Sequence, residues 1–218
     1  MNMSKTLGRT ESDQEYAGLM QTYIESKYGV EFRVQEFIFP EAGINSGMQE
    51  NVLVVQDPSG ITANVSARMG TPYNYYDDYA DALGAARIQS SLNLSELHKW
   101  GNAQLYAVMK TSDISKIDAS AAGVSSVTLV VNIPQPYSEG AMQSLYNVYS
   151  QICDAGYQKL YLIAWFTDGS AEFDQAVNNY RIYGKSDWLN YSGTVHAALK
   201  ITAAGLPYDD FVAALIVN

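Results

Sequence analysis

The sequence predicts an α+β fold, in which an N-terminal helix packs on an antiparallel sheet and a βαβ-like C-terminal half follows. A helical apolar period opens the chain, two β-rich runs joined by a turn come next, and strand-like and helix-like segments alternate after residue 126. With 218 residues the chain is long enough for one large domain or two small ones. We therefore expect one region at 12–110 and another at 127–218, with a single continuous domain as the alternative.

The first predicted element is a helix from Ser12 to Tyr28. Its apolar side chains recur at three- and four-residue spacing, which produces one apolar face. Ser12 followed by Glu15 has the pattern of a capping box, and Gly29 stands where a helix C-terminal cap is expected.

Strands are predicted directly after this helix. The stretch "VEFRVQEFIF" alternates apolar and polar residues, which is typical of a half-buried strand. The stretch "NVLVVQDPSGITANVSAR" contains two β-rich runs joined by residues 57–60. Pro58 at the second turn position and Gly60 at the fourth suit a type I turn, so these runs predict a hairpin.

The stretch "GTPYNYYDDYADALG" contains four tyrosines and three aspartates in fifteen residues. One interpretation is local: it starts an alanine-rich helix that continues to about His98, with Tyr75 and Tyr79 on its inward face and acids in its first turn. The other interpretation is a binding surface made by Tyr73, Tyr76, Asp77 and Asp78. Tyrosines stack on sugars or aromatic partners, and carboxylates can hold a cation, although the spacing of a calcium loop is absent.

The remaining segments predict the second half of the fold. A strand is expected at 102–110, and the small, polar stretch 111–126 is expected to be a loop and the best place for an internal boundary. Strands at 127–133, 160–166 and 194–202 then alternate with helices at 138–155 and 171–183, and a short helix ends the chain. A second cluster of aromatic and acidic residues, "AWFTDGSAEFD", follows a buried strand. Since α/β sheets often bind ligands at strand ends, Trp165 and Asp168 are further candidates, with a simple turn as the competing explanation.

Charge and motif content exclude several classes of function. The net charge is −10, and the 13 Lys and Arg residues form no run, which argues against nucleic acids and anionic membrane surfaces. No apolar run approaches the ~20 residues needed to span a bilayer. The single cysteine, Cys153, excludes an internal disulfide and a Cys-rich zinc site, and its helical position predicts a buried, inert thiol.

Catalytic and cofactor motifs are not found. Neither His98 nor His196 has a second potential metal ligand at i+2 or i+4, and no phosphate-binding glycine motif or G-x-S-x-G is present. We therefore predict no catalytic residue, no metal and no cofactor, and an enzyme is not the favoured class.

The stretches "YIESKYGVEFRV", "VVQDPSG" and "YNYYDDYADAL" together resemble a motif of uncharacterised envelope proteins and lipoproteins of Gram-positive bacteria. The resemblance covers roughly Gln14 to Leu97 and implies location and fold rather than activity. The start of the chain, "MNMSKTLGRTESDQ", departs from those proteins because it contains neither a lipobox cysteine nor an apolar signal segment. The expectation is an extracytoplasmic or envelope protein if an export signal was removed, and a cytoplasmic one otherwise.

Together these observations favour a non-catalytic, acidic, tyrosine-rich bacterial protein that binds a protein or saccharide surface outside the cytoplasm. The alternative is a cytoplasmic enzyme or small-molecule-binding domain with its site at the strand end near Trp165 and Ser170. A homo-oligomeric structural protein also stays open, because the acidic chain carries many aromatic residues. The ligand and the oligomeric state are not predicted.

Overall fold

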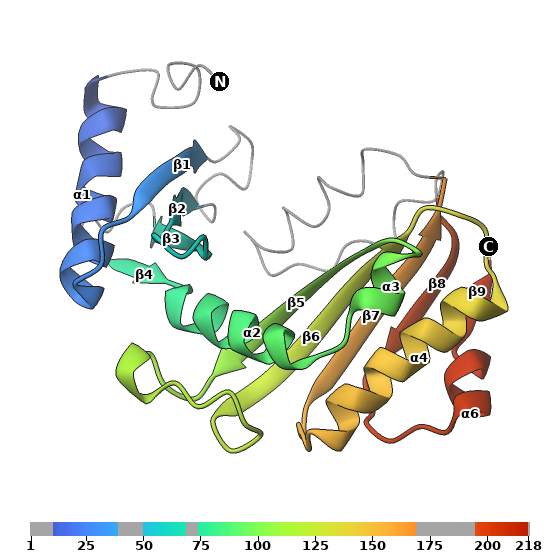
Figure 1. Ribbon diagram of the computed structural model, residues 1–218. Coiled ribbons are helices and arrows are strands. Elements are labelled where there is room, and N and C mark those ends of the chain that lie inside the picture. The colour runs from blue at the N-terminus through green and yellow to red at the C-terminus, as the bar shows by residue number, and fades with distance from the viewer. Residues whose placement is uncertain (1–10, 39–49, 69–73, 169–194, 218) are drawn as a thin grey trace. The chain divides into compact units, whose positions relative to one another are not determined.

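Residues 11–38, 50–68, 74–168 and 195–217 are described by the computed structural model (Figure 1). The predicted α+β class is confirmed, with an N-terminal helix followed by an antiparallel sheet. The chain divides into two units, Met1–Leu83 and Gly84–Asn218.

The first unit contains helix α1 (Glu11–Tyr28) and a four-stranded sheet. Its strands are β1 (Arg33–Ile38), β2 (Glu50–Gln56), β3 (Thr62–Arg68) and β4 (Tyr75–Asp77), in the order β1-β2-β3-β4 with every neighbouring pair antiparallel. The helix predicted at 12–28 is confirmed. It ends at Gly29, whose φ is 65° and whose N–H donates to the carbonyl oxygen of Glu25 at 2.8 Å.

The predicted hairpin is also confirmed. The N–H of Gly60 donates to the carbonyl oxygen of Asp57 at 3.0 Å, which closes the turn between β2 and β3. Helix α1 contacts β2, β3 and β4. Met20 and Ile24 of α1 are fully buried, as are Leu53 and Val65 of the sheet, so the core of this unit includes residues from both layers.

The tyrosine-rich stretch was wrongly predicted as the start of a helix. Tyr75 to Asp77 form β4 instead, which pairs with β3 through Ala67↔Tyr75 and Ser66↔Tyr76. The ring of Tyr75 lies 6.3 Å from that of Tyr16 and 5.5 Å from that of Tyr23, both in α1. These contacts and the pairing with β3 hold the segment extended. Helix α2 (Tyr79–Ser91) follows, and a separate short helix α3 (Ser95–His98) ends the region predicted as one helix.

The second unit contains a five-stranded sheet in the order β5-β6-β7-β8-β9. Its strands are β5 (Asn102–Met109), β6 (Val124–Ile133), β7 (Leu160–Thr167), β8 (Val195–Ile201) and β9 (Leu215–Val217). Strands β6 and β7 are parallel and joined through helix α4 (Glu139–Asp154), so the predicted βαβ-like unit is confirmed. The other pairs are antiparallel.

Strand β5 belongs to the second unit, because it pairs along its length with β6. The connection between them contains a short 3-10 helix, Ile114–Lys116. The boundary between the units therefore falls inside α2, whereas the sequence analysis placed it in 111–126.

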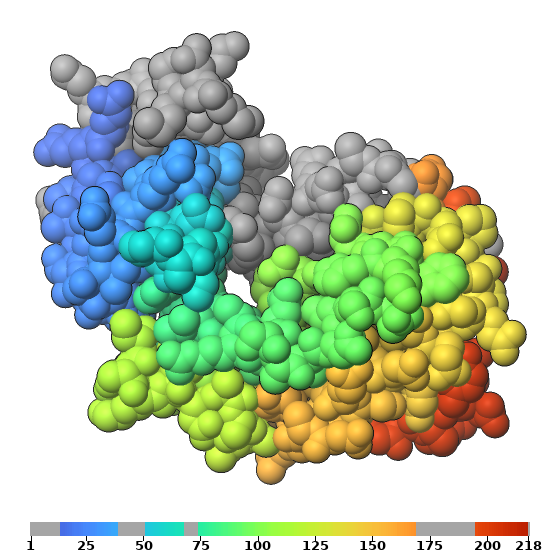
Figure 2. Space-filling view, viewed as in Figure 1, coloured from blue at the N-terminus to red at the C-terminus, as the bar shows by residue number. Residues whose placement is uncertain are grey.

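Helix α4 begins as its sequence indicates. The side-chain hydroxyl of Ser138 accepts a hydrogen bond from the N–H of Ala141 at 3.3 Å, which is an N-cap. Met142, Leu145 and Ile152 on the inner face are fully buried. The helix lies in front of β7 in Figure 1, and its outer face forms part of the surface seen in Figure 2.

The chain ends with α6 (Tyr208–Ala213) and β9. The helix was predicted, but β9 was not, because a strand of three residues gives too short a pattern to recognise. The helix predicted at 171–183 lies outside the described residues. No helix among the described residues is long and apolar enough to cross a membrane.

Candidate functional site

Among the described residues of the predicted tyrosine and aspartate surface, Tyr76 alone has a widely accessible side chain. It lies on β4 opposite Ser66 and is 44% exposed. Tyr73 lies outside the described residues. The side chains of Asp77 and Asp78, in contrast, are engaged by other parts of the first unit.

Asp77 connects β4 to the C-terminal end of α1. Its carboxylate accepts hydrogen bonds from Lys27 Nζ at 2.6 Å, from Tyr23 OH at 3.0 Å and from Tyr28 OH at 2.7 Å. The backbone N–H of Tyr79 donates to it at 3.2 Å. The Asp77 side chain has no exposed surface, so the contacts that balance its buried charge come from within the protein.

This carboxylate also changes the acidity of its neighbours. Burial alone would lower the pKa of Lys27, but the hydrogen bond to Asp77 outweighs it and raises that pKa above its ordinary value. Burial, together with the hydrogen bond to Asp77, raises the pKa of Tyr28. Lys27 therefore stays charged and Tyr28 stays neutral at neutral pH, so both can donate hydrogen bonds to Asp77.

Two further aspartates form hydrogen bonds with strands, turns and helices of the same unit. Asp78 accepts from the backbone N–H of Asn64 at 2.5 Å and from its side-chain amide at 2.8 Å. Asp57 accepts from Ser59 Oγ at 2.8 Å, from the N–H of Ile61 at 2.8 Å and from Tyr79 OH at 2.8 Å. The aspartates of this unit thus connect β2, β3, β4 and the start of α2.

The second predicted site lies where β6 and β7 end. Trp165 is only 2% exposed and packs in a cluster with Val130 and Ala198, whereas Asp168 is exposed directly after β7.

The strand end between Trp165 and Asp168 is held by a buried hydrogen bond: Thr167 Oγ1 donates to Asn132 Oδ1 at 2.8 Å, which joins the two parallel strands. The ring of Tyr137, in the loop after β6, lies 5.7 Å from that of Phe166. Asp168 and Tyr137 are thus accessible near this strand end, while Trp165 is part of the core. Ser170 lies outside the described residues.

Cys153 is half-buried rather than fully buried, and its sulfur accepts from the N–H of Gly205 at 3.4 Å. Among the described residues, no group of three or more His, Cys, Asp or Glu side chains is placed to hold a metal ion.

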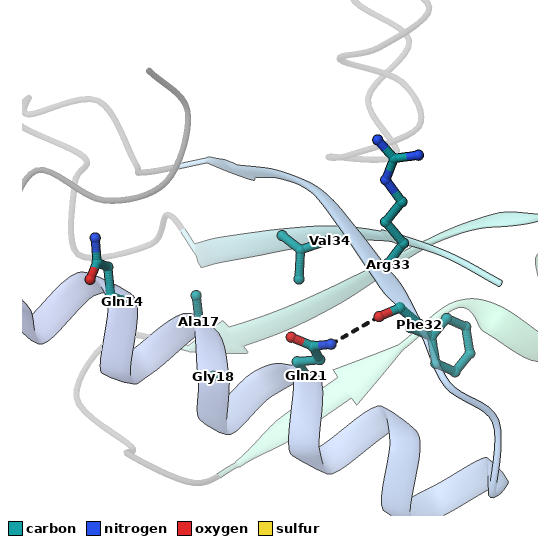
Figure 3. A pocket seen from close by; sticks show the side chains of 7 residues that line it. All are labelled: Gln14, Ala17, Gly18, Gln21, Phe32, Arg33 and Val34. Carbon is teal, nitrogen blue, oxygen red and sulfur yellow. Dashed lines mark hydrogen bonds between the residues drawn. The ribbon is translucent and has the colours of Figure 1, made fainter. Parts of the chain in front are cut away.

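A groove that the sequence analysis did not predict lies between α1 and β1 (Figure 3). It has a volume of about 470 Å³, within the ~300–1,000 Å³ typical of ligand pockets. The residues that line it come from α1, from β1 and from the position directly before β1: Gln14, Ala17, Gly18, Gln21, Phe32, Arg33 and Val34.

The signal that could have indicated this groove is Gly18. A glycine inside a helix costs stability relative to alanine, so its presence in the predicted helix suggests a reason other than helix formation. A Cβ atom at Gly18 would have no atom within 4 Å, so the helix surface is open at that point.

Comparisons with known proteins give one structural similarity. No family model matches the sequence, and no curated protein matches it. A crystal structure of a DUF5037 family protein from Ruminococcus gnavus is 14% identical and has a TM-score of 0.48, over 91% of this chain and 98% of that one. A similarity at this level is too weak to transfer a ligand or an activity, and the resemblance to Gram-positive envelope proteins stays a prediction.

Proposed function

We propose that this chain is a non-catalytic binding protein that presents Tyr76 to a protein or saccharide surface. The observation that carries the proposal is the contrast within β4. Tyr76 is 44% exposed, while the neighbouring Tyr75 and Asp77 are fixed by contacts with α1. A tyrosine offers a large amphipathic ring at low entropic cost, which is typical of binding surfaces.

The first test is thermal unfolding of the protein with a panel of saccharides. A ligand that binds only the folded state adds ~2.7 kcal/mol at one hundred times its Kd, which is measurable as a rise of several degrees in Tm. If no saccharide acts, crosslinking followed by mass spectrometry identifies protein partners.

The site is then tested with Tyr76→Ala and, as a control, Tyr161→Ala, which removes another exposed tyrosine from β7 in the second unit. We expect Tyr76→Ala to change the free energy of unfolding by less than ~0.5 kcal/mol and to abolish binding, while the control binds normally. A large fall in stability on Tyr76→Ala would show that the ring is part of the core. Unchanged binding would exclude Tyr76 from the site.

We propose an extracytoplasmic location on composition: the chain has 17 tyrosines but only 13 Lys and Arg residues together. The DNA upstream of Met1 tests this location. An in-frame export signal supports it, and a stop codon directly upstream contradicts it.

The strand end near Asp168 supports a second candidate, a cytoplasmic small-molecule-binding domain or enzyme. Parallel strands β6 and β7 end there, and ligands commonly bind at such ends of α/β sheets. Nucleotides in the same thermal panel distinguish the two candidates, since a nucleotide shift that Tyr76→Ala leaves unchanged favours this one.

A further inference from the structure

We propose that the groove between α1 and β1 binds an extended peptide, which adds to the first sheet as a strand beside β1 and places an acidic side chain next to Arg33. This site lies on the opposite edge of the sheet from β4 and does not depend on Tyr76.

Phe32, directly before β1, already forms hydrogen bonds with two side chains of α1. Gln21 Nε2 donates to the carbonyl oxygen of Phe32 at 2.9 Å, and the N–H of Phe32 donates to Glu25 Oε1 at 3.0 Å (Figure 3 shows the first of these). Both backbone groups of Phe32 therefore point away from β2. Since the backbone groups of alternate residues in a strand point to the same edge, those of Val34 point there too. Among the described strands, none pairs with β1 on this edge.

The α1 side of the groove is open at Gly18. The α1 side of the groove is formed by Gln14, Ala17, Gly18 and Gln21, of which Gly18 contributes no side chain. A helix beside an exposed strand edge is an arrangement that binds extended peptides, with main-chain hydrogen bonds supplying affinity and alternate side chains supplying specificity.

The length of the added strand is limited by β1 itself. Its register with β2 shifts between Val34 and Glu36, which is a β-bulge or a similar irregularity. Because α1 already holds both backbone groups of Phe32, the regular edge open to a peptide is confined to Val34, and a peptide pairs there through the N–H and carbonyl oxygen of that residue. The bulge and the exposed charges of β1 also discourage pairing with an unrelated strand.

Charge selects the kind of peptide. Among the described residues that line the groove, Arg33 is the only charged one. Figure 3 shows its side chain extending from β1 away from α1, and the structure records no ion pair between it and another described residue. In an added strand, alternate side chains point to the two faces of the sheet, so a residue beside Arg33 lies on the face away from α1. A carboxylate at that position complements the guanidinium, whereas a basic residue opposes it.

The test begins with a phage-displayed library of random peptides selected on the full-length protein. We expect enriched sequences with apolar residues and an acidic residue at alternating positions. Synthetic versions are then measured by fluorescence polarisation. A library that yields no binder overturns the proposal.

Gly18→Leu is the variant that blocks the groove. Because a Cβ at this position meets nothing within 4 Å, leucine fits the folded helix and occupies the open space. We expect affinity to fall by at least ~10-fold while Tm does not fall. The matched control Gly18→Ala, which leaves most of the space open, binds within about threefold of the parent protein by the same reasoning. Equal binding by the leucine variant would place the peptide elsewhere.

Two further measurements identify the mode of binding. N-methylation of the peptide residue opposite Val34 removes a strand hydrogen bond and is expected to abolish binding, while methylation of the next residue is tolerated. Arg33→Glu is expected to weaken the binding of acidic peptides and to reverse its salt dependence, because added salt then screens a repulsion. A peptide that is insensitive to N-methylation binds by its side chains alone, which contradicts strand addition. Tyr76→Ala is expected to leave all of these peptide affinities unchanged. The peptide site and the proposed function of Tyr76 are therefore tested independently, and one can be wrong while the other holds.

Discussion

Gly18 and Gly29 have the same free space around them but different backbone conformations. A Cβ at either position would meet nothing within 4 Å, yet Gly29 has a φ of +65° and Gly18 lies inside α1. Gly18→Ala is expected to raise the free energy of unfolding by ~0.5–1 kcal/mol, since alanine loses less entropy in a helix. Gly29→Ala is expected to lower it by ~1–2 kcal/mol, because a side chain disfavours the left-handed region.

Urea unfolding monitored by circular dichroism measures both effects as shifts of the midpoint at constant slope. If both variants shift in the same direction, free space rather than backbone conformation decides the effect of the added methyl group.

Asp57 gives the first unit a pH dependence. Burial opposes its charge, but hydrogen bonds from Ser59, Ile61 and Tyr79 outweigh burial and lower the pKa of the carboxyl below its ordinary value. A depressed folded-state pKa contributes stability above the unfolded value of ~3.9, and this contribution is lost as pH falls through the folded pKa. Asp57→Asn is therefore expected to be less stable than the parent at pH 7, with the difference shrinking below about pH 4.

Urea midpoints of both proteins between neutral and acidic pH provide the measurement. A difference that stays constant below pH 4 would mean that the charge of Asp57 contributes nothing and that the amide disturbs the turn by its shape.

At the scale of elements, local signals predicted well wherever they were strong. The cap at Gly29, the turn around Gly60 and the helix start near Ser138 all lie where the sequence predicted them. Strand β4 was missed because Tyr75 and Tyr79 have helical spacing, while the pairing partner that makes Tyr75 extended is Ala67 of β3. Pairing of this kind depends on tertiary contacts, which override local preference.

The candidate sites were less predictable than the elements. Asp77 sits in a stretch that suggests an exposed acidic surface, but its donors Lys27 and Tyr28 lie about fifty residues earlier in the chain. The groove between α1 and β1 likewise depends on how a helix lies beside a strand edge. The local sequence signal for this groove is Gly18, a glycine inside a helix. Residue types therefore pointed to the aspartates and tyrosines of this stretch as candidate site residues, but they did not predict which of these side chains face solvent.

At the scale of the whole molecule, the chain forms two units that each have a buried core. In the first, the Asp77 cluster connects α1 to β4. In the second, Phe211 of α6 is fully buried and packs against Tyr146 and Tyr149 of α4, at ring distances of 5.2 and 5.0 Å. Because these groups stabilise different units, damage to one is expected to stay local.

Asp77→Ala removes the buried acceptor of Lys27, Tyr23 and Tyr28 and is expected to cost about 3 kcal/mol, at the low end for a broken buried pair because Lys27 is partly exposed. Phe211→Ala is expected to cost a similar ~3–5 kcal/mol by leaving a cavity. Hydrogen exchange measured by mass spectrometry on both variants compares where the protection is lost. Asp77→Ala should speed exchange in α1 and β3, and Phe211→Ala should speed it in α4 and β7.

The two variants serve as controls for each other, since each destabilises one unit by a comparable amount. Helix α2 is the informative segment, because the boundary between the units falls within it. Hydrogen exchange in its first residues, which include the buried Tyr79 that donates to Asp57, should speed up in Asp77→Ala. Exchange in its later residues should speed up in Phe211→Ala. If either substitution speeds exchange equally in every element, the chain unfolds as one cooperative body and the division into two units has no energetic counterpart.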